Sequence, residues 1–281
     1  MVAIGKYNKL KVVKRVDFGL YLDGEEHGEI LLPLRYVPEN AEVESFIDVF
    51  IYLDSEDRII ATTIKPFAQV DEVAYLKVVS VNTIGAFLDW GLMKDLLVPF
   101  REQQKTMEVG KYYLVFVYLD SDSKRIVASA KLDKFLDNVP PPYIEGEEVD
   151  LIIAHQTDIG YNAVINHMHW GMIYSNEVFH PLAKGLRIKG YIKKVREDDK
   201  IDLSIQKPGY QRIEGVSALL LKKLEENGGF LRLTDKTNPE YIHMKLGISK
   251  KAFKMAVGAL YKARLIKLEE DGIQLVSQNE N

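Results

Sequence analysis

The chain repeats one short phrase three times, and no other feature restricts its fold as strongly. The phrase places a glycine before alternating apolar residues, at 18–23, 84–90 and 159–164, and its glycines Gly19, Gly85 and Gly160 are 66 and 75 residues apart. Each phrase follows an apolar, β-branched run, so the two together predict a β-hairpin bent at the glycine. With about five short strands per copy, the repeat predicts three small β-barrels in series.

A second phrase closes each copy. Tyr-Leu-Asp followed by Arg-Ile-Ile ends the first copy at residue 60, and Tyr-Leu-Asp followed by Arg-Ile-Val ends the second at residue 127. The third copy closes in a more divergent form at 189–195 and 200–204. Asp54 and Asp120 end the Tyr-Leu-Asp triplets and begin Asp- and Ser-rich stretches, which favour hairpin turns. A carboxylate pair for nuclease chemistry is the alternative interpretation of these two residues.

The repeats set the predicted domain boundaries: barrels at 1–66, 67–133 and 146–209, a proline-rich linker at 134–145 and a last domain at 213–278. Three consecutive prolines at 140–142 have no amide donors and favour an extended chain, which is typical of a semi-rigid spacer. Such a stretch can also be a ligand for an aromatic groove, but it lacks a spaced second proline. The short connection at 65–67 predicts that the first two barrels pack as a pair.

After residue 211 the apolar period changes from two to 3.6 residues, which indicates helices. The first helix is predicted to stop at the Asn-Gly-Gly sequence of 227–229. Pro239 suits the first turn of a second helix that ends at Gly247, and Ser249 can cap a third that runs to about Arg264. A tight apolar hairpin follows. Three helices and a hairpin predict a winged helix, a variant of the helix-turn-helix.

Composition limits the classes of function. The sequence of 281 residues has no cysteine, which excludes disulfides, thiolate metal sites and a cysteine nucleophile. It contains no apolar run that could span a bilayer and no signal peptide, so we expect a cytoplasmic protein without a membrane partner. The net charge of −4 means that a polyanion must be bound by local patches, and residues 245–267 hold seven basic residues and no acid.

The three β-units resemble S1 RNA-binding domains, five-stranded oligonucleotide-binding barrels with a motif similar to Phe-Gly-Ala-Phe-Val-Asp. Residues 18–23 and 84–89 match this motif, and 201–207 match the Ile-Ser-Leu-Ser-Leu-Lys that closes such a domain. Three such domains before a winged helix resemble the conserved virulence factor B family of bacterial RNA-binding proteins, and residues 249–262 carry the specific match. The resemblance implies post-transcriptional control of gene expression, including virulence genes in pathogens.

The resemblance also implies which side chains touch RNA. Exposed aromatics on such a barrel stack on unpaired bases, and Phe18, Tyr21 and Phe87 stand at the stacking positions. In the third unit Asn162 replaces the second aromatic, and Tyr161 and Tyr174 are the predicted substitutes. Basic candidates complete the predicted RNA-binding set: Lys193 and Lys194 in the third unit, and Lys250, Lys251, Lys254, Lys262 and Arg264 on or beside the third helix, where 100° per residue gathers the lysines on one face.

The sequence also bears on a metal site, on enzymatic activity and on other partners. His167 and His169 would project to one face of a strand and could bind a metal, but Met168 and Trp170 favour a hairpin packed by its own side chains. The sequence has no Gly-rich phosphate loop, metalloprotease motif or nucleophile elbow, so we predict no enzyme, no catalytic residue, no metal and no cofactor. The expected partner is single-stranded RNA. The alternatives are a DNA-binding regulator acting through the winged helix and a component of an RNA-processing machine.

Overall fold

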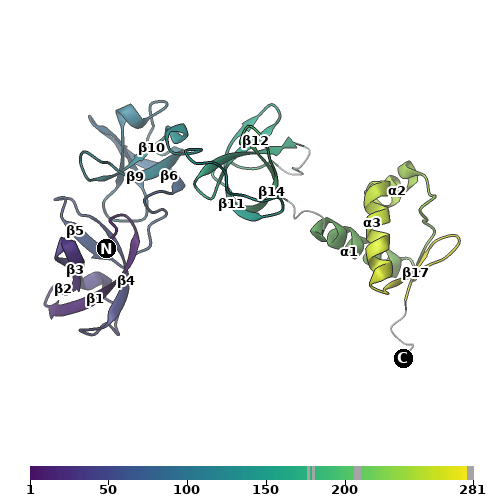
Figure 1. Ribbon diagram of the computed structural model, residues 1–281, viewed down its shortest axis with the longest axis horizontal. Coiled ribbons are helices and arrows are strands. Elements are labelled where there is room, and N and C mark those ends of the chain that lie inside the picture. The colour runs from purple at the N-terminus through teal and green to yellow at the C-terminus, as the bar shows by residue number, and fades with distance from the viewer. Residues whose placement is uncertain (176–177, 179–180, 206–209, 277–281) are drawn as a thin grey trace. The chain divides into compact units, whose positions relative to one another are not determined.

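The fold class predicted from the sequence is confirmed: the chain is mainly β, with three closed barrels in tandem and a C-terminal winged helix (Figure 1). The computed structural model describes residues 1–175, 178, 181–205 and 210–276, so the predicted domain ends at 209 and 278 lie outside the described residues. Contacts divide the chain into two compact units. The first holds barrels 1 and 2 with part of barrel 3, and the second holds the rest of barrel 3 with the winged helix.

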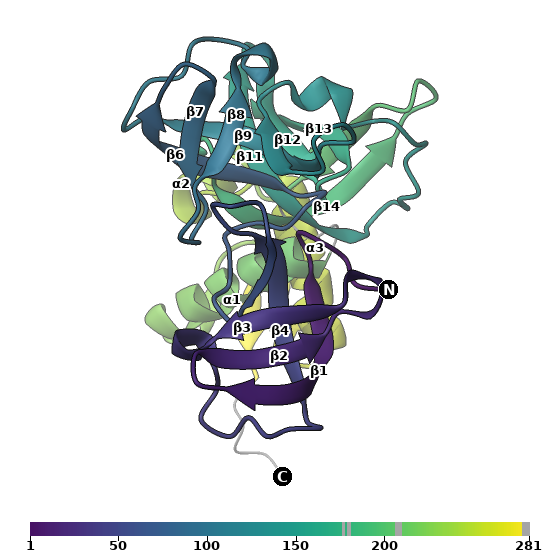
Figure 2. The same ribbon diagram turned by 90° about the vertical axis from the view of Figure 1, so that its left-hand side faces the viewer.

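Each barrel has five strands in the same order, in which the fifth strand lies between the third and the fourth. Figure 2 shows β1, β2 and β3 side by side in barrel 1. The strands of barrel 1 are β1 (Tyr7–Val16), β2 (Gly19–Asp23), β3 (Glu29–Pro33), β4 (Phe46–Leu53) and β5 (Ile59–Thr62). Barrel 2 has β6 (Val73–Val81), β7 (Gly85–Asp89), β8 (Leu96–Pro99), β9 (Tyr112–Leu119) and β10 (Ile126–Ser129), and barrel 3 has β11 (Glu148–Thr157), β12 (Gly160–Ile165), β13 (His169–Tyr174), β14 (Arg187–Val195) and β15 (Ile201–Ser204).

The repeated glycine opens the second strand of each barrel, and in barrels 1 and 2 two backbones meet there. A Cβ built on Gly85 would lie 2.2 Å from the carbonyl oxygen of Val98, and one on Gly19 would lie 2.2 Å from the carbonyl oxygen of Leu32. No side chain fits so close to a neighbouring strand. The glycine therefore fixes the pairing of the second and third strands, in which Gly19 faces Pro33 and Gly85 faces Pro99.

A bulge in the first strand recurs at the same place in all three barrels. The register shifts between Val12 and Lys14, between Val78 and Ser80, and between Ile153 and His155. Directly after each bulge a pair of residues faces outward: Lys14 with Tyr21, Ser80 with Phe87, and His155 with Asn162. A bulge re-aims side chains locally, so it sets which residues the barrel presents at this position.

Tyr161 was predicted to contact RNA, and the structure corrects this assignment. The residue after the glycine points into each barrel, because Leu20, Ala86 and Tyr161 are all buried, Tyr161 with only 7% of its surface exposed. The next residue points outward, at Tyr21, Phe87 and Asn162. Since successive strand residues face opposite sides, a shift of one position exchanges core for surface. Tyr161 is therefore a core side chain, and Asn162 occupies the outward position.

Barrels 2 and 3 meet through an apolar cluster inside the first unit. The ring of Phe135 stacks on that of Phe116 at 4.4 Å and 10°. The amide of Asp137 donates to the carbonyl of Met168 at 2.9 Å, and Trp170 Nε1 donates to Asp133 at 3.0 Å. The first residues of the segment predicted as a linker, 134–145, thus bind both barrels rather than span between them.

The winged helix has three helices and a three-stranded sheet of order β16-β18-β17. Pro239 begins α2, Gly247 ends it and the Ser249 side chain accepts a hydrogen bond at the start of α3, as the sequence predicted. The structure adds that the Asn238 side chain caps α2 and that Gly247 is left-handed. The two-residue strand β16 was not predicted. The elements are α1 (Tyr210–Glu226), β16 (Phe230–Leu231), α2 (Pro239–Leu246), α3 (Lys250–Lys262), β17 (Ile266–Leu268) and β18 (Ile273–Leu275).

The junction of barrels 2 and 3 should weaken in mild acid. His167 Nδ1 accepts a hydrogen bond from the amide of Val73 at 2.9 Å, so the ring is neutral there. Burial lowers the pKa of His167, Glu72 and Asp150 raise it, and Arg187 lowers it further; the net shift is downward. In the unfolded chain His167 binds a proton at about pH 6.5, whereas in the folded protein it binds one only at lower pH. The free energy of unfolding therefore decreases as the pH falls through about 6.5.

The measurement is the thermal midpoint between about pH 7.5 and pH 5.5 for the wild type and for His167→Asn. Asparagine does not titrate and tolerates the positive φ of 63° at this position. The variant should lose less stability on acidification than the wild type. Equal losses in the two proteins would contradict the assignment.

Truncating Tyr161 should destabilise the barrel. Tyr161→Ala is expected to lower the free energy of unfolding by about 3–5 kcal/mol, as for other large aromatic core side chains. Asn162→Ala, one residue away on the outward face, removes one hydrogen bond to His155 and should cost about 1 kcal/mol. Urea unfolding of both variants checks the inward and outward assignment, and equal costs would contradict it.

Candidate nucleic-acid interface

The outward face of barrel 1 carries an aromatic pair beside a cation. Phe18, in the turn before β2, is 57% exposed, and its ring meets the half-buried Tyr21 edge to face at 6.2 Å. Lys14 Nζ lies 4.7 Å from the centre of the Tyr21 ring, a cation–π contact, and 2.5 Å from Glu29. Across the sheet Tyr21 neighbours Leu31, which neighbours Ile60. The face thus combines ring surface, apolar surface and a positive charge.

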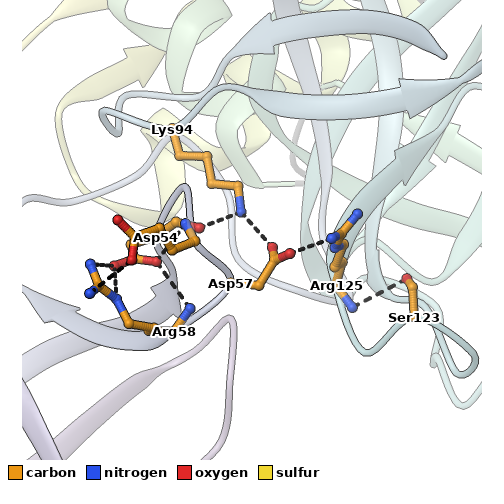
Figure 3. A network of polar contacts seen from close by, with 7 residues as sticks. Asp54, Asp57, Arg58, Lys94, Ser123 and Arg125 are labelled. Carbon is orange, nitrogen blue, oxygen red and sulfur yellow. Dashed lines mark hydrogen bonds and ion pairs between the residues drawn. The ribbon is translucent and has the colours of Figure 1, made fainter.

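The outward face of barrel 2 has the same row, with Ser80, Phe87, Leu97 and Val127 as cross-strand neighbours. Phe87 is half-buried, and it lines one cavity together with the β4–β5 hairpin of barrel 1. The hairpin brings Asp57 to two cations of barrel 2, Lys94 and Arg125 (Figure 3).

Lys94 and Arg125 were not in the predicted site. Lys94 has no counterpart in the repeated phrases, but Arg125 has one, because it precedes the fifth strand of barrel 2 as Arg58 precedes that of barrel 1. Arg58 binds Asp54 of its own hairpin, and Arg125 binds Asp57 of the neighbouring barrel. The hydrogen bonds from Lys94 and Arg125 lower the pKa of Asp57, so its carboxylate stays charged at neutral pH.

In barrel 3 the residues considered for RNA binding differ in the contacts that they make. Asn162 Nδ2 is 3.2 Å from His155 Nε2, and the His155 ring lies edge-on to Trp170 at 6.5 Å. The hydroxyl of Tyr174, which is half-buried, accepts a hydrogen bond from Arg196 at 2.6 Å, and Arg196 also pairs with Asp202 at 2.9 Å. Lys193 and Lys194 are exposed on β14.

The winged helix presents its basic face as the helical period predicted. Phe253, Ala256 and Leu260 are buried against the domain core, and Val257 packs partly against it. The predicted basic residues lie on the other side or beyond the helix end: Lys251, Lys254, Lys262 and Arg264 are exposed, and Lys250 is half-buried. Of these, Lys254 lies 3.9 Å from Asp235. Exposed lysines in the third helix stand where a helix-turn-helix protein reads nucleic acid.

The side chains considered for a nuclease or a metal site make hydrogen bonds with backbone atoms. Asp54 and Asp120 accept hydrogen bonds within their own turns, from the amides of Glu56 and Ser123. His169 Nε2 is 2.8 Å from the carbonyl oxygen of Val139. Over the residues that the structure describes, no cluster of three His, Asp or Glu side chains could hold a metal, and no helix is long and apolar enough to cross a membrane.

Comparisons with known proteins bear on the two kinds of domain. The S1 domain family matches residues 4–64 and 72–131, and a family described as the CvfB-like winged helix domain matches 218–275. The protein YitL of Bacillus subtilis is 28% identical over 92% of this chain and 89% of its own. Conserved virulence factor B of Staphylococcus epidermidis is 24% identical over 98% of this chain and 95% of its own.

Among solved structures, a multidomain protein with nucleic acid binding domains from Streptococcus pneumoniae is 22% identical and covers 97% of this chain and 98% of its own, with a TM-score of 0.41. The domain families explain the order of folds found here, since S1 barrels precede a winged helix of the CvfB type. The relatives YitL and conserved virulence factor B align over 89% and 95% of their own length. The chain therefore carries S1 domains followed by a winged helix of the CvfB-like family, and it is related to conserved virulence factor B over most of its length.

Proposed function

We propose that the protein binds single-stranded RNA through the outward faces of its barrels, with basic contacts added by the winged helix. The observation that carries the proposal is the row shared by barrels 1 and 2, in which Tyr21 or Phe87 lies in mid-sheet beside apolar neighbours and cations. An aromatic ring stacks on any base, but only on a base that is unpaired.

The charge of the chain favours RNA binding at local surface patches over attraction by the whole surface. The chain carries a net charge of −4, so long-range attraction does not bring a polyanion to its whole surface. Stacking does not depend on net charge, and it supplies affinity where charge is limited. We propose binding without catalysis, because the side chains at these faces offer stacking and charge and form no acid–base or metal constellation.

The biological role proposed is post-transcriptional control of gene expression. Relatives are named conserved virulence factor B, and on that basis we propose that the regulated genes include virulence genes where the host organism is a pathogen. A second candidate function is DNA binding by the winged helix, which the exposed lysines of α3 favour. Competition of a labelled unstructured RNA against duplex DNA and duplex RNA separates the two, since barrels that stack bases discriminate against both duplexes.

The aromatic residues should contribute directly to binding. Tyr21→Ala and Phe87→Ala are each expected to weaken the affinity for an unstructured RNA oligonucleotide by about 1–3 kcal/mol, the value of one stacked base. Fluorescence anisotropy measures the affinity, and a melting curve shows whether the barrel stays folded.

Phe46→Ala is the matched control, because Phe46 is an exposed aromatic of barrel 1 on β4, outside the row. Its affinity should equal that of the wild type. If the two row variants bind as tightly as Phe46→Ala while all three stay folded, the outward rows do not stack bases. If the wild type binds duplex and single strand equally, the proposed function itself is wrong.

The basic helix face should contribute charge. Changing Lys251, Lys254 and Lys262 to Gln is expected to flatten the slope of log affinity against log salt by roughly 0.7 per lost phosphate contact on a single strand. Three exposed lysines elsewhere, Lys65, Lys77 and Lys222, changed in the same way, control for net charge. An unchanged slope in the folded α3 variant would assign this face to another partner, such as a protein.

A further inference from the structure

The β4–β5 hairpin of barrel 1 and the outward face of barrel 2 together form an open cleft. A cavity of about 340 Å³ lies between them, with Leu53, Ser55 and Asp57 on the hairpin side. Phe87, Leu97 and Val127 line it from the sheet of barrel 2. The two barrels belong to one compact unit, so the cavity is a feature of the folded pair.

The floor of the cavity is apolar and continuous. Phe87 pairs with Leu97 across β7 and β8, and Leu97 pairs with Val127 across β8 and β10. A volume of about 340 Å³ lies at the lower end of the range for small-ligand pockets, which is ~300–1,000 Å³. It suits one nucleotide rather than a run of stacked bases.

The rim of the cavity holds two cations that share one carboxylate. Lys94 Nζ lies 3.0 Å from Asp57 Oδ1 and 2.5 Å from the carbonyl oxygen of Asp54. Arg125 Nη2 pairs with the other oxygen of Asp57, so this carboxylate bridges the two cations (Figure 3). Asp95 also lines the cavity, so its two cations stand against two carboxylates, and a phosphate gains from these cations only when Asp57 gives way.

The ion pairs at the rim are accessible to solvent. Asp57 and Lys94 each expose 36% of their side chains and Arg125 exposes 54%. Ion pairs this exposed are weak, because water screens them and holding two long side chains costs entropy. A phosphate carries an oxygen fork that guanidinium binds through two parallel hydrogen bonds, so it can replace a carboxylate at Arg125.

We propose that this cavity is a binding site for one unpaired nucleotide of RNA, whose phosphate takes the place of the Asp57 carboxylate between Lys94 and Arg125. The base lies on the ring of Phe87. This inference rests on the proposed function and adds three things to it: the site needs both barrels, Lys94 and Arg125 are its phosphate ligands, and Asp57 competes with the ligand.

Asp57 is placed to move away when a phosphate arrives. It lies in the tip of a two-strand hairpin, with a φ of 61°, while its backbone is held by the bond from its amide to the carbonyl of Asp54. The side chain can therefore change rotamer while the turn keeps its bonds. The opposing interpretation is that Asp57 only clamps barrel 1 to barrel 2, and the two interpretations predict opposite effects of removing its charge.

The test is Asp57→Asn in the full-length protein, with a labelled oligouridylate of about twelve nucleotides as the probe. If Asp57 competes with phosphate, the variant binds several-fold more tightly. The slope of log affinity against log salt also becomes steeper by up to about 0.7, because the site loses one negative charge that opposes its one phosphate. Unchanged or weaker binding by the folded variant overturns the proposal.

Two further variants separate the site from general charge effects. Asp122→Asn removes a carboxylate from the corresponding turn of barrel 2, where Asp122 is exposed and bonds to Ser121 at 3.5 Å, and it should leave the affinity nearly unchanged. The gain in affinity should disappear when Asp57→Asn is combined with Lys94→Gln and Arg125→Gln, because the two cations that bind the phosphate are then absent. An equal gain in Asp122→Asn, or a gain that survives the triple variant, overturns the proposal.

A second measurement covers the case in which Asp57→Asn does not fold. Lys94→Gln with Arg125→Gln in the wild-type background should weaken binding several-fold and flatten the salt slope, and an unchanged slope overturns the proposal. Trp90 lines the same cavity, so its fluorescence should change as the oligouridylate binds to wild type, and the same change should need several-fold more oligouridylate in the Lys94→Gln, Arg125→Gln variant. If wild type binds no single-stranded RNA at all, the proposed function fails rather than this inference alone.

Discussion

The close approach of two backbones at the repeated glycine determines most of what the barrels present. Since a Cβ on Gly85 would lie 2.2 Å from the Val98 carbonyl oxygen, the second and third strands can pair only with glycine at this point. That pairing sets the register, and the register decides that Leu88 is buried while Phe87 faces outward. The bulge in the first strand then brings Ser80 beside Phe87. The choice of which residues are buried and which face outward thus follows from one backbone contact.

Patterns local in sequence predicted the fold, and contacts between distant residues were missed. The repeats, Pro239 in the first turn of one helix, the cap at Ser249 and the change of period are all local, and they were sufficient to predict three barrels and a winged helix. Tyr161 was assigned to the wrong face because a shift of one residue along a strand reverses its direction, and residue type alone does not fix the register. The pairing of Asp57 with Lys94 depends on how one barrel packs on the next, for which a single sequence carries no periodic signal.

Four cations near the proposed faces already have carboxylate partners. Lys14 pairs with Glu29, Lys94 and Arg125 pair with Asp57, and Arg196 pairs with Asp202. A phosphate must therefore compete with a carboxylate at these four cations, and the gain from each exchange is smaller than from binding an unpaired cation. If the barrels bind RNA as proposed, stacking supplies the affinity, and the paired charges limit non-specific attraction to a chain with a net charge of −4.

Because a phosphate gains little by replacing a carboxylate at one face, the tandem arrangement of barrels 1 and 2 is important. Barrels 1 and 2 lie in one compact unit, so an RNA strand held on the Tyr21 row of barrel 1 is kept at a high effective concentration near barrel 2. The second contact then costs little translational entropy, and two modest sites act together as a stronger one. This gain requires that the strand stay unpaired between the two faces, because a duplex cannot turn its bases toward either ring. Under the proposed function, selectivity for single strands therefore arises from the pair of barrels more than from either barrel alone.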